Sequence, residues 1–64
     1  MSPTQKQAGY LLDLLAKRFQ QDWDGATAWV QEHSVSHIST VTVSQIMKRL
    51  DVDEVSSLIA ELAK

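Results

Sequence analysis

The sequence predicts an all-α domain of four short helices, with an extended connector before the third helix and a helix-turn-helix-like pair at its C-terminal end. Two observations carry this prediction. Apolar residues recur at the spacing i, i+3, i+4, i+7, which marks one face of a helix with 3.6 residues per turn. Three of the expected helices also begin with a capping box, in which Ser, Thr or Asp is followed three residues later by Gln or Glu.

The first helix is expected at about residues 3–21. Pro3 suits the first helical position, and two alternative capping boxes are present, one beginning at Ser2 and one at Thr4. The apolar stripe of this helix comprises Ala8, Leu11, Leu12, Leu15 and Phe19, and it is widened by Tyr10 and Leu14. This is the longest of the predicted helices.

A shorter second helix is expected at about residues 25–34, with Asp24 as its N-cap. Its apolar face comprises Ala26, Trp29, Val30 and His33. Trp23 stands four residues after Phe19 and is expected to continue the apolar face of the first helix as the chain turns.

Residues 35–43 are rich in β-branched side chains and serine, a composition that favours an extended backbone. The sequence contains no second strand for this segment to pair with. We therefore expect an extended connector whose Val35, Ile38 and Val41 pack on the helices. Pairing of the segment with a symmetry-related copy is the alternative.

Two further helices are expected at about residues 42–50 and 53–63, with capping boxes that begin at Thr42 and Asp51. Their apolar positions are Val43, Ile46, Met47 and Leu50 in one helix and Val55, Leu58, Ile59 and Leu62 in the other. The link between them is short, which forces a sharp angle. The two stripes must pack on each other or on a common neighbour, and the first helix is the candidate.

The composition limits what this chain can be. Its 64 residues suffice for one domain, and a chain of this size buries only about 60% of its unfolded surface, so dimerisation would add stability. Cysteine is absent, which excludes disulfides and zinc sites built from thiolates. No segment resembles a signal peptide or is apolar over membrane length, so we expect a cytoplasmic protein that does not enter membranes.

A metal site or a catalytic site is not expected. His33 and His37 are spaced to share a helix face, but no third ligand is fixed by the spacing. The run Asp22–Gly25 resembles the start of a calcium loop, whose twelfth position would need Glu and here is His33. Serines near the histidines lack an orienting acid and an oxyanion hole. The prediction is a non-enzymatic protein with no cofactor.

DNA binding by the C-terminal pair of helices is an alternative function, because helix-turn-helix proteins place their second helix in the major groove. The residues available for such contacts are Lys48, Arg49, Ser56, Ser57 and Lys64. Asp53 and Glu54 stand at the start of that helix, where they would face an anionic groove. The net charge of −2 also lacks the basic excess of a typical nucleic-acid binder.

Inhibition of a nucleic-acid enzyme through an acidic face is a further alternative. The residues of that face would be Asp51, Asp53, Glu54 and Glu61. Eight carboxylates in the whole chain are too few for general mimicry of DNA charge, so only a local effect is conceivable.

Binding of a protein partner is the preferred function. Two Trp, one Tyr, one Phe and two Met are many for so short a chain, and Trp and Tyr are enriched at interface hot spots. The residues that we expect at the interface are Tyr10, Trp23, Trp29 and Met47. The competing interpretation is that all of them fill the small core. Homodimerisation is plausible because small cores gain stability from it.

Three segments resemble a known family: TQKQAGYLLDLLAKR at residues 4–18, ATAWV at 26–30 and DEVSSLIAELAK at 53–64. Their order is similar to that in the small helical domain of GemA-like regulators of transposable phages. The resemblance implies an accessory protein that acts on host or phage nucleic-acid machinery. It supplies no active-site motif, so no residue role is carried over.

Overall fold

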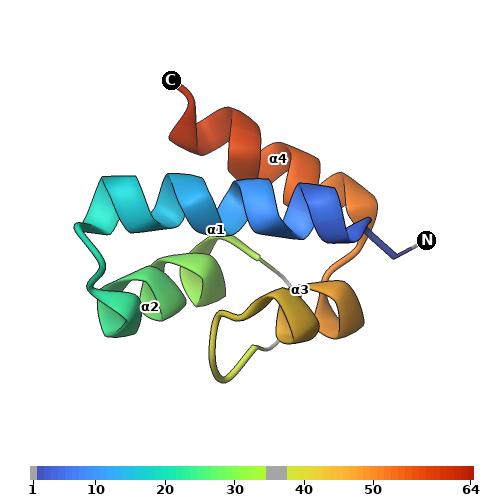
Figure 1. Ribbon diagram of the computed structural model, residues 1–64, viewed down its shortest axis with the longest axis horizontal. Helices are drawn as coiled ribbons and strands as arrows, with labels where there is room; N and C mark the ends of the chain where they lie inside the picture. Colours follow the sequence, from blue (N-terminus) through green and yellow to red (C-terminus); the bar gives the residue numbers. More distant parts are fainter. Residues whose placement is uncertain (1, 35–37) are drawn as a thin grey trace.

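The computed structural model describes residues 2–34 and 38–64 of the chain. Four helices follow one another along the sequence: α1 (Gln5–Phe19), α2 (Trp23–His33), α3 (Val43–Arg49) and α4 (Val52–Leu62) (Figure 1). No strand occurs in either described range. The predicted all-α class is therefore confirmed.

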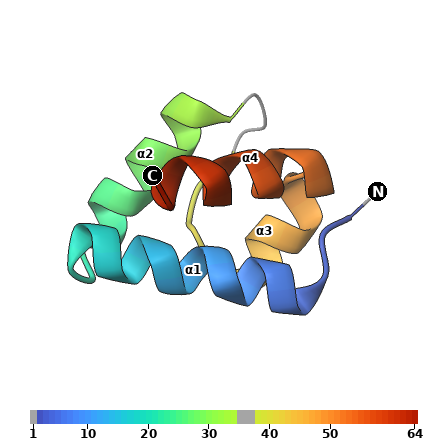
Figure 2. The same ribbon diagram turned by 90° about the horizontal axis from the view of Figure 1, so that it is seen from above.

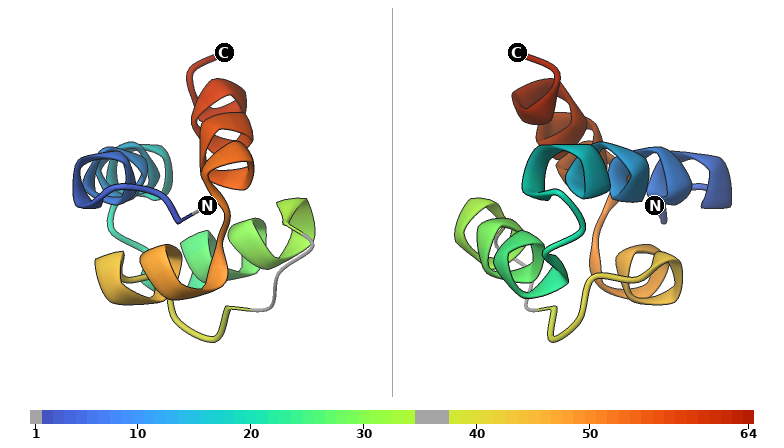
Figure 3. Two further views of the ribbon diagram at one scale, coloured as in Figure 1. Left: turned by 90° about the vertical axis from the view of Figure 1, so that its right-hand side faces the viewer. Right: turned by 60° about the vertical axis from the view of Figure 1, so that its left-hand side comes forward.

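Helix α1 is the centre of the fold, since each of the other three helices packs against it. Seen from the front and from above, α4 lies beside α1 and runs in the same general direction (Figures 1 and 2). Helices α2 and α3 lie together on the other side of this pair (Figure 3). The two C-terminal helices thus use α1 as their common neighbour.

The core draws on all four helices and on the connector. Its buried side chains are Ala8, Leu11, Leu15, Ala26, Val30, Ile38, Val41, Ile46, Leu50, Val55 and Leu58. The remaining predicted apolar positions that are partly buried against it are Leu12, Phe19, Trp29, Val43, Met47, Ile59 and Leu62. His33 departs from the prediction because its side chain is exposed, and Tyr10 is 52% exposed.

The start of α1 decides between the two predicted capping boxes. The Thr4 hydroxyl accepts a hydrogen bond from the Gln7 backbone N–H at 3.1 Å, and the Gln7 side chain accepts from the Thr4 N–H at 2.9 Å. The box beginning at Ser2 is therefore wrong. The helix also ends two residues before the predicted position, because Gln20 and Gln21 both adopt positive φ angles, 53° and 66°.

The N-cap of α2 is Asp22 rather than the predicted Asp24. Its Oδ1 accepts a hydrogen bond from the Gly25 N–H at 3.2 Å. A Cβ atom at position 25 would lie 2.8 Å from Asp22 Oδ2, so any larger residue there would displace the capping carboxylate. The left-handed turn at Gln20 and Gln21 brings the chain back early enough for α2 to begin at Trp23.

The connector packs on α2, as predicted for Ile38 and Val41. The Gln31 side-chain amide donates a hydrogen bond to the Ile38 carbonyl at 2.7 Å, and the Val41 N–H donates to the Thr27 hydroxyl at 3.3 Å. Both hydrogen bonds satisfy backbone polar groups of buried residues. The corresponding prediction for Val35 lies outside the described residues.

The last two helices begin at the predicted caps. The Thr42 hydroxyl accepts from the Gln45 N–H at 3.1 Å, but the Gln45 side chain does not complete the predicted box, whereas Asp51 and Glu54 form a complete capping box. Helix α4 begins at Val52, one residue before the predicted start. The link from α3 is only two residues long, and it carries the buried Leu50 into the core.

Candidate protein-binding site

An apolar hollow of about 370 Å³ opens where α1, the start of α2 and the start of α3 meet. Its lining residues are Leu12, Trp23, Thr40, Val41, Thr42 and Val43. In Figure 1 this region lies below α1, where the segment leading into α3 passes between α2 and α3. We call it the Trp23 hollow.

Trp23 forms the exposed rim of the Trp23 hollow. Its side chain is 41% exposed, although it is among the largest apolar side chains of the protein. The cap at Asp22 makes it the first residue of α2 and so places it at the edge of the core rather than inside. Its indole N–H has no hydrogen-bond partner within residues 2–34 and 38–64.

The floor and walls of the Trp23 hollow are apolar. Val41 is only 5% exposed and belongs to the core, whereas Leu12 and Val43 are half-buried and pack against the core from either side. The hydroxyl of Thr42 already accepts the N-cap hydrogen bond of α3. The arrangement leaves an apolar concave surface exposed.

The side chain of Thr27 links the two segments that carry Trp23 and Val41. The Thr27 hydroxyl accepts a hydrogen bond from the Val41 N–H at 3.3 Å and donates one to the Trp23 carbonyl at 2.8 Å. The connector and the first turn of α2 are thereby tied to one side chain. The hollow is therefore part of the folded framework.

Two exposed charged side chains lie on the helices that contribute to the Trp23 hollow, but neither lines it. Asp24 follows Trp23 on α2, and Lys48 lies in the last turn of α3. Neither forms an ion pair within the described part of the chain.

The four residues predicted for the interface do not form one patch. Trp23 lines the hollow, but Tyr10 is exposed elsewhere on α1. Trp29 is partly buried, with its ring 6.3 Å edge-to-face from Phe19 and stacked 4.3 Å from His33, and Met47 packs against the core. The sequence predicts that Val41 packs on the helices, but not that the connector lines a hollow with Trp23, because its position depends on hydrogen bonds to the side chains of α2.

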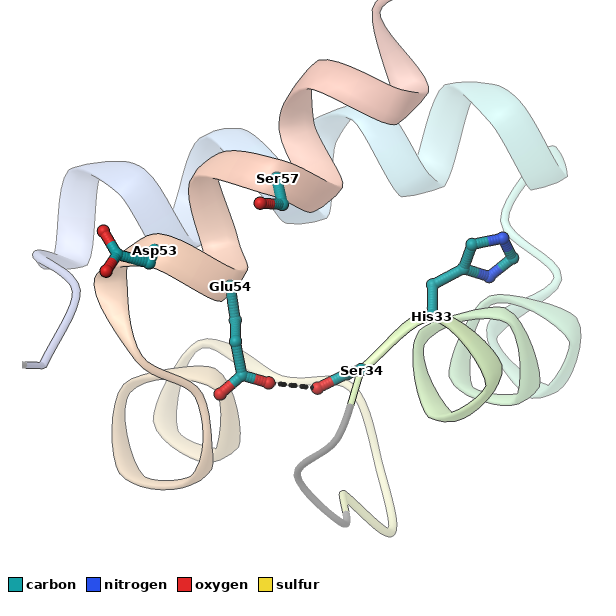
Figure 4. Close-up of a pocket in the computed structure, with 5 residues that line it drawn as sticks. All are labelled: His33, Ser34, Asp53, Glu54 and Ser57. Atoms are coloured by element: carbon teal, nitrogen blue, oxygen red, sulfur yellow. Dashed lines mark hydrogen bonds between the residues drawn. The ribbon is translucent and has the colours of Figure 1, made fainter.

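A second, polar hollow of about 240 Å³ lies between the end of α2 and the start of α4. It is lined by His33, Ser34, Asp53, Glu54 and Ser57 (Figure 4). The Ser34 hydroxyl donates a hydrogen bond to Glu54 Oε2 at 2.5 Å, and Glu54 Oε1 accepts from the Asp51 N–H at 3.4 Å. Glu54 therefore caps α4 and joins it to the end of α2.

His33 of the polar hollow is bonded to the backbone of its own helix. His33 Nδ1 lies 2.9 Å from the Trp29 carbonyl, and because that oxygen can only accept, Nδ1 must donate. Figure 4 shows His33 on one side of the hollow and Asp53 on the other, while Ser34 is hydrogen-bonded to Glu54.

In residues 2–34 and 38–64, no three His, Asp or Glu side chains gather as they would around a metal ion. Asp22, the first residue of the calcium-like run, is used as a helix cap. The prediction that involved His37 lies outside the described residues. His33 itself is exposed rather than partly buried as expected.

The residues of the DNA-binding alternative occupy two helices. Lys48 and Arg49 lie in the last turn of α3, and Ser56 and Ser57 are exposed on α4. At the end of the chain Lys64 pairs with Glu61, with 3.2 Å between Nζ and Oε2. The exposed surface of α4 therefore carries little net positive charge.

Comparison of the chain with protein-family models, with curated proteins and with solved structures returns no match. Among the four described helices, none combines the length and the apolar character needed to cross a membrane.

Proposed function

We propose that this chain is a non-enzymatic interaction module that binds a protein partner at the Trp23 hollow. The observation that carries the proposal is the exposure of Trp23 at the rim of an apolar hollow, while the core side chains beneath it are buried. Tryptophan is among the residues that contribute most to protein interfaces.

Two physical arguments support a protein as the ligand. Covering Trp23, Leu12 and Val43 would remove apolar surface from water, which favours association by roughly 25 cal/mol per Å² before the costs of binding. A polypeptide also offers carbonyl oxygens for the free indole N–H, which satisfies the polar end of an otherwise apolar side chain.

The biological role that we propose is that of an accessory or regulatory factor in the cytoplasm. The resemblance of residues 4–18, 26–30 and 53–64 to GemA-like regulators of transposable phages supports this role. Such a factor acts by contact and needs no catalytic group.

Site-specific photo-cross-linking tests this proposal. A photoreactive amino acid at position 23 should give a discrete protein adduct, which mass spectrometry can identify, and the adduct should disappear when Val43→Asp is added. The same amino acid at Glu32, an exposed position outside the hollow, is the matched control. Equal adducts from positions 23 and 32, or none from position 23, would contradict the proposal.

DNA binding is a second candidate, favoured by the adjacent exposed cations Lys48 and Arg49. A duplex titrated at several salt concentrations would test it, because phosphate contacts weaken steeply as salt rises. Steeply salt-dependent binding that is lost in the double variant Lys48→Ala with Arg49→Ala would support DNA binding over protein binding. The acidic-face alternative is less well supported, because Asp51 and Glu54 are already used to cap α4.

A further inference from the structure

We propose that Asp24–Gly25 is a site of spontaneous isomerisation, at which the peptide bond to Gly25 passes from the backbone carbonyl of Asp24 to its side chain, and that the Asp22 cap sets the rate. The inference concerns a covalent change in the first turn of α2. Its consequence for binding rests on the proposed function of the Trp23 hollow, because Trp23 is the first residue of that turn.

Asp24–Gly25 is the place in the sequence where this chemistry is easiest. The chain contains no asparagine, and its only aspartate followed by glycine is Asp24. Each other aspartate is followed by a residue whose side chain shields the next backbone nitrogen, whereas glycine leaves that nitrogen accessible. The Asp24 side chain is exposed and has no hydrogen bond or ion pair within residues 2–34 and 38–64, so it is free to react.

The reaction needs only water. The Gly25 nitrogen attacks Cγ of the protonated Asp24 carboxyl group, and the amide proton and the carboxyl hydroxyl leave as water, which closes a cyclic imide. Water then opens the imide at either carbonyl. Opening at the Cγ carbonyl restores aspartate, whereas opening at the backbone carbonyl leaves Gly25 attached to Cγ as isoaspartate. The water lost in the first step is regained in the second, so the mass of the chain does not change.

The position of Gly25 in α2 leaves its nitrogen held by one side chain alone. In the middle of a helix each backbone N–H donates to the carbonyl four residues earlier, but the first turn lacks such partners. The first intrahelical bond of α2 joins the Ala26 N–H to the Asp22 carbonyl at 3.0 Å. The Gly25 N–H instead donates to Asp22 Oδ1 at 3.2 Å, and the negative charge of that carboxylate opposes loss of the proton. Attack on Asp24 therefore requires the cap to open.

Isomerisation would disrupt the turn that carries Trp23. Isoaspartate at position 24 adds one carbon atom to the main chain. The hydrogen bonds that span this position include that of the Ala26 N–H with the Asp22 carbonyl and that of the Thr27 hydroxyl with the Trp23 carbonyl. Both depend on the ordinary main-chain spacing, so the rim of the Trp23 hollow would move relative to its floor.

Incubation of the purified chain at physiological temperature and pH tests the inference, with isoaspartate located by electron-transfer fragmentation in a mass spectrometer. Isoaspartate should accumulate at position 24. Asp22→Ala should speed its formation about fivefold, because loss of a helix N-cap makes local opening of the turn easier. The full chain unfolded in urea should react faster still, since no cap remains.

Three control variants separate the cap from other effects, and circular dichroism should show that each is folded. Asp22→Ser keeps an oxygen that accepts from the Gly25 N–H, so its rate should lie closer to that of wild type than to that of Asp22→Ala. Glu32→Ala removes an exposed carboxylate of the same helix away from the cap and should leave the rate within about twofold of wild type. Asp24→Glu should form no product, because its longer side chain closes the ring poorly.

Equal rates in wild type and Asp22→Ala, or no isoaspartate at position 24 in the chain unfolded in urea, would overturn the inference. The effect on binding is measured by photo-cross-linking at position 23, where the isolated isoaspartate form should give less adduct than the unmodified chain. Equal adducts from the two forms would contradict the expected effect on the Trp23 hollow. If the unmodified chain gives no adduct, the proposed function fails, while the isomerisation site stands on the mass-spectrometric result.

Discussion

The Val41 backbone N–H donates a hydrogen bond to the Thr27 hydroxyl at 3.3 Å, which joins the connector to α2. The same hydroxyl donates to the Trp23 carbonyl, so one side chain positions the floor and the rim of the Trp23 hollow. The fold and the proposed binding surface therefore depend on the same contact.

Replacing Thr27 with valine should remove this link with little change in side-chain volume. The Val41 N–H would lose its partner at a position that is 5% exposed, so the free energy of unfolding should fall by about 1–3 kcal/mol. Urea denaturation, monitored by circular dichroism, measures the change. Thr27→Ser keeps the hydroxyl and should cost less, and equal losses in the two variants would show that the hydrogen bond is unimportant.

The two glycines should respond in opposite ways to substitution by alanine. A Cβ at position 25 would lie 2.8 Å from Asp22 Oδ2 and disturb the cap of α2, so Gly25→Ala should cost about 1 kcal/mol. A Cβ at position 9 meets nothing within 4 Å in the middle of α1, so Gly9→Ala should stabilise the protein by up to about 1 kcal/mol. Thermal unfolding of both variants checks the signs, and the same sign for both would contradict this account.

The hydrogen bond between Ser34 and Glu54 should couple the end of α2 to the start of α4. Ser34→Ala is expected to lower the free energy of unfolding by about 1–2 kcal/mol, because the hydroxyl donates to a carboxylate. A double-mutant cycle with Glu54→Gln isolates the pairwise contribution. A coupling energy near zero would show that Glu54 acts only as the cap of its own helix.

Adjacent residues of α1 should differ sharply in their tolerance of truncation. Leu11 is fully buried, so Leu11→Ala should cost about 2–5 kcal/mol, enough to abolish cooperative unfolding in a small domain. Tyr10 is exposed, so Tyr10→Ala should change the free energy of unfolding by about 0.5 kcal/mol or less. Similar losses of unfolding free energy in the two variants would contradict the assignment of Leu11 to the core and Tyr10 to the surface.

The helices could be predicted from the sequence because their signals are local. Period-3.6 stripes such as Leu11 to Leu15 mark the buried faces, and the N-cap of α3 at Thr42 and the capping box of α4 at Asp51 each lie within four residues of chain. The errors occurred where a local signal was ambiguous. Asp22 and Asp24 are equally good caps in isolation, and the left-handed turn at Gln20–Gln21 decides between them.

The candidate site could be predicted only in part. The exposure of an aromatic side chain depends on tertiary packing, which the sequence does not reveal. The sequence therefore predicts both Trp23 and Trp29 at the interface, although Trp29 packs between Phe19 and His33. The hollow itself is built from segments far apart in the chain, Leu12 and residues 40–43. Their proximity follows from tertiary packing, in which Leu12 lies against the core that contains Val41, and from the Thr27–Val41 hydrogen bond, and no sequence pattern marks either contact.

The most direct test of the central claim, that the Trp23 hollow is the interaction surface, is a nuclear magnetic resonance titration of the two tryptophan indole N–H signals. Trp23→Phe and Trp29→Phe assign the two signals. When the concentration of the chain is raised, or when the protein captured at position 23 is added, the Trp23 signal should shift while the Trp29 signal stays in place. A shift confined to Trp29, or no shift at either indole under both conditions, would contradict the claim.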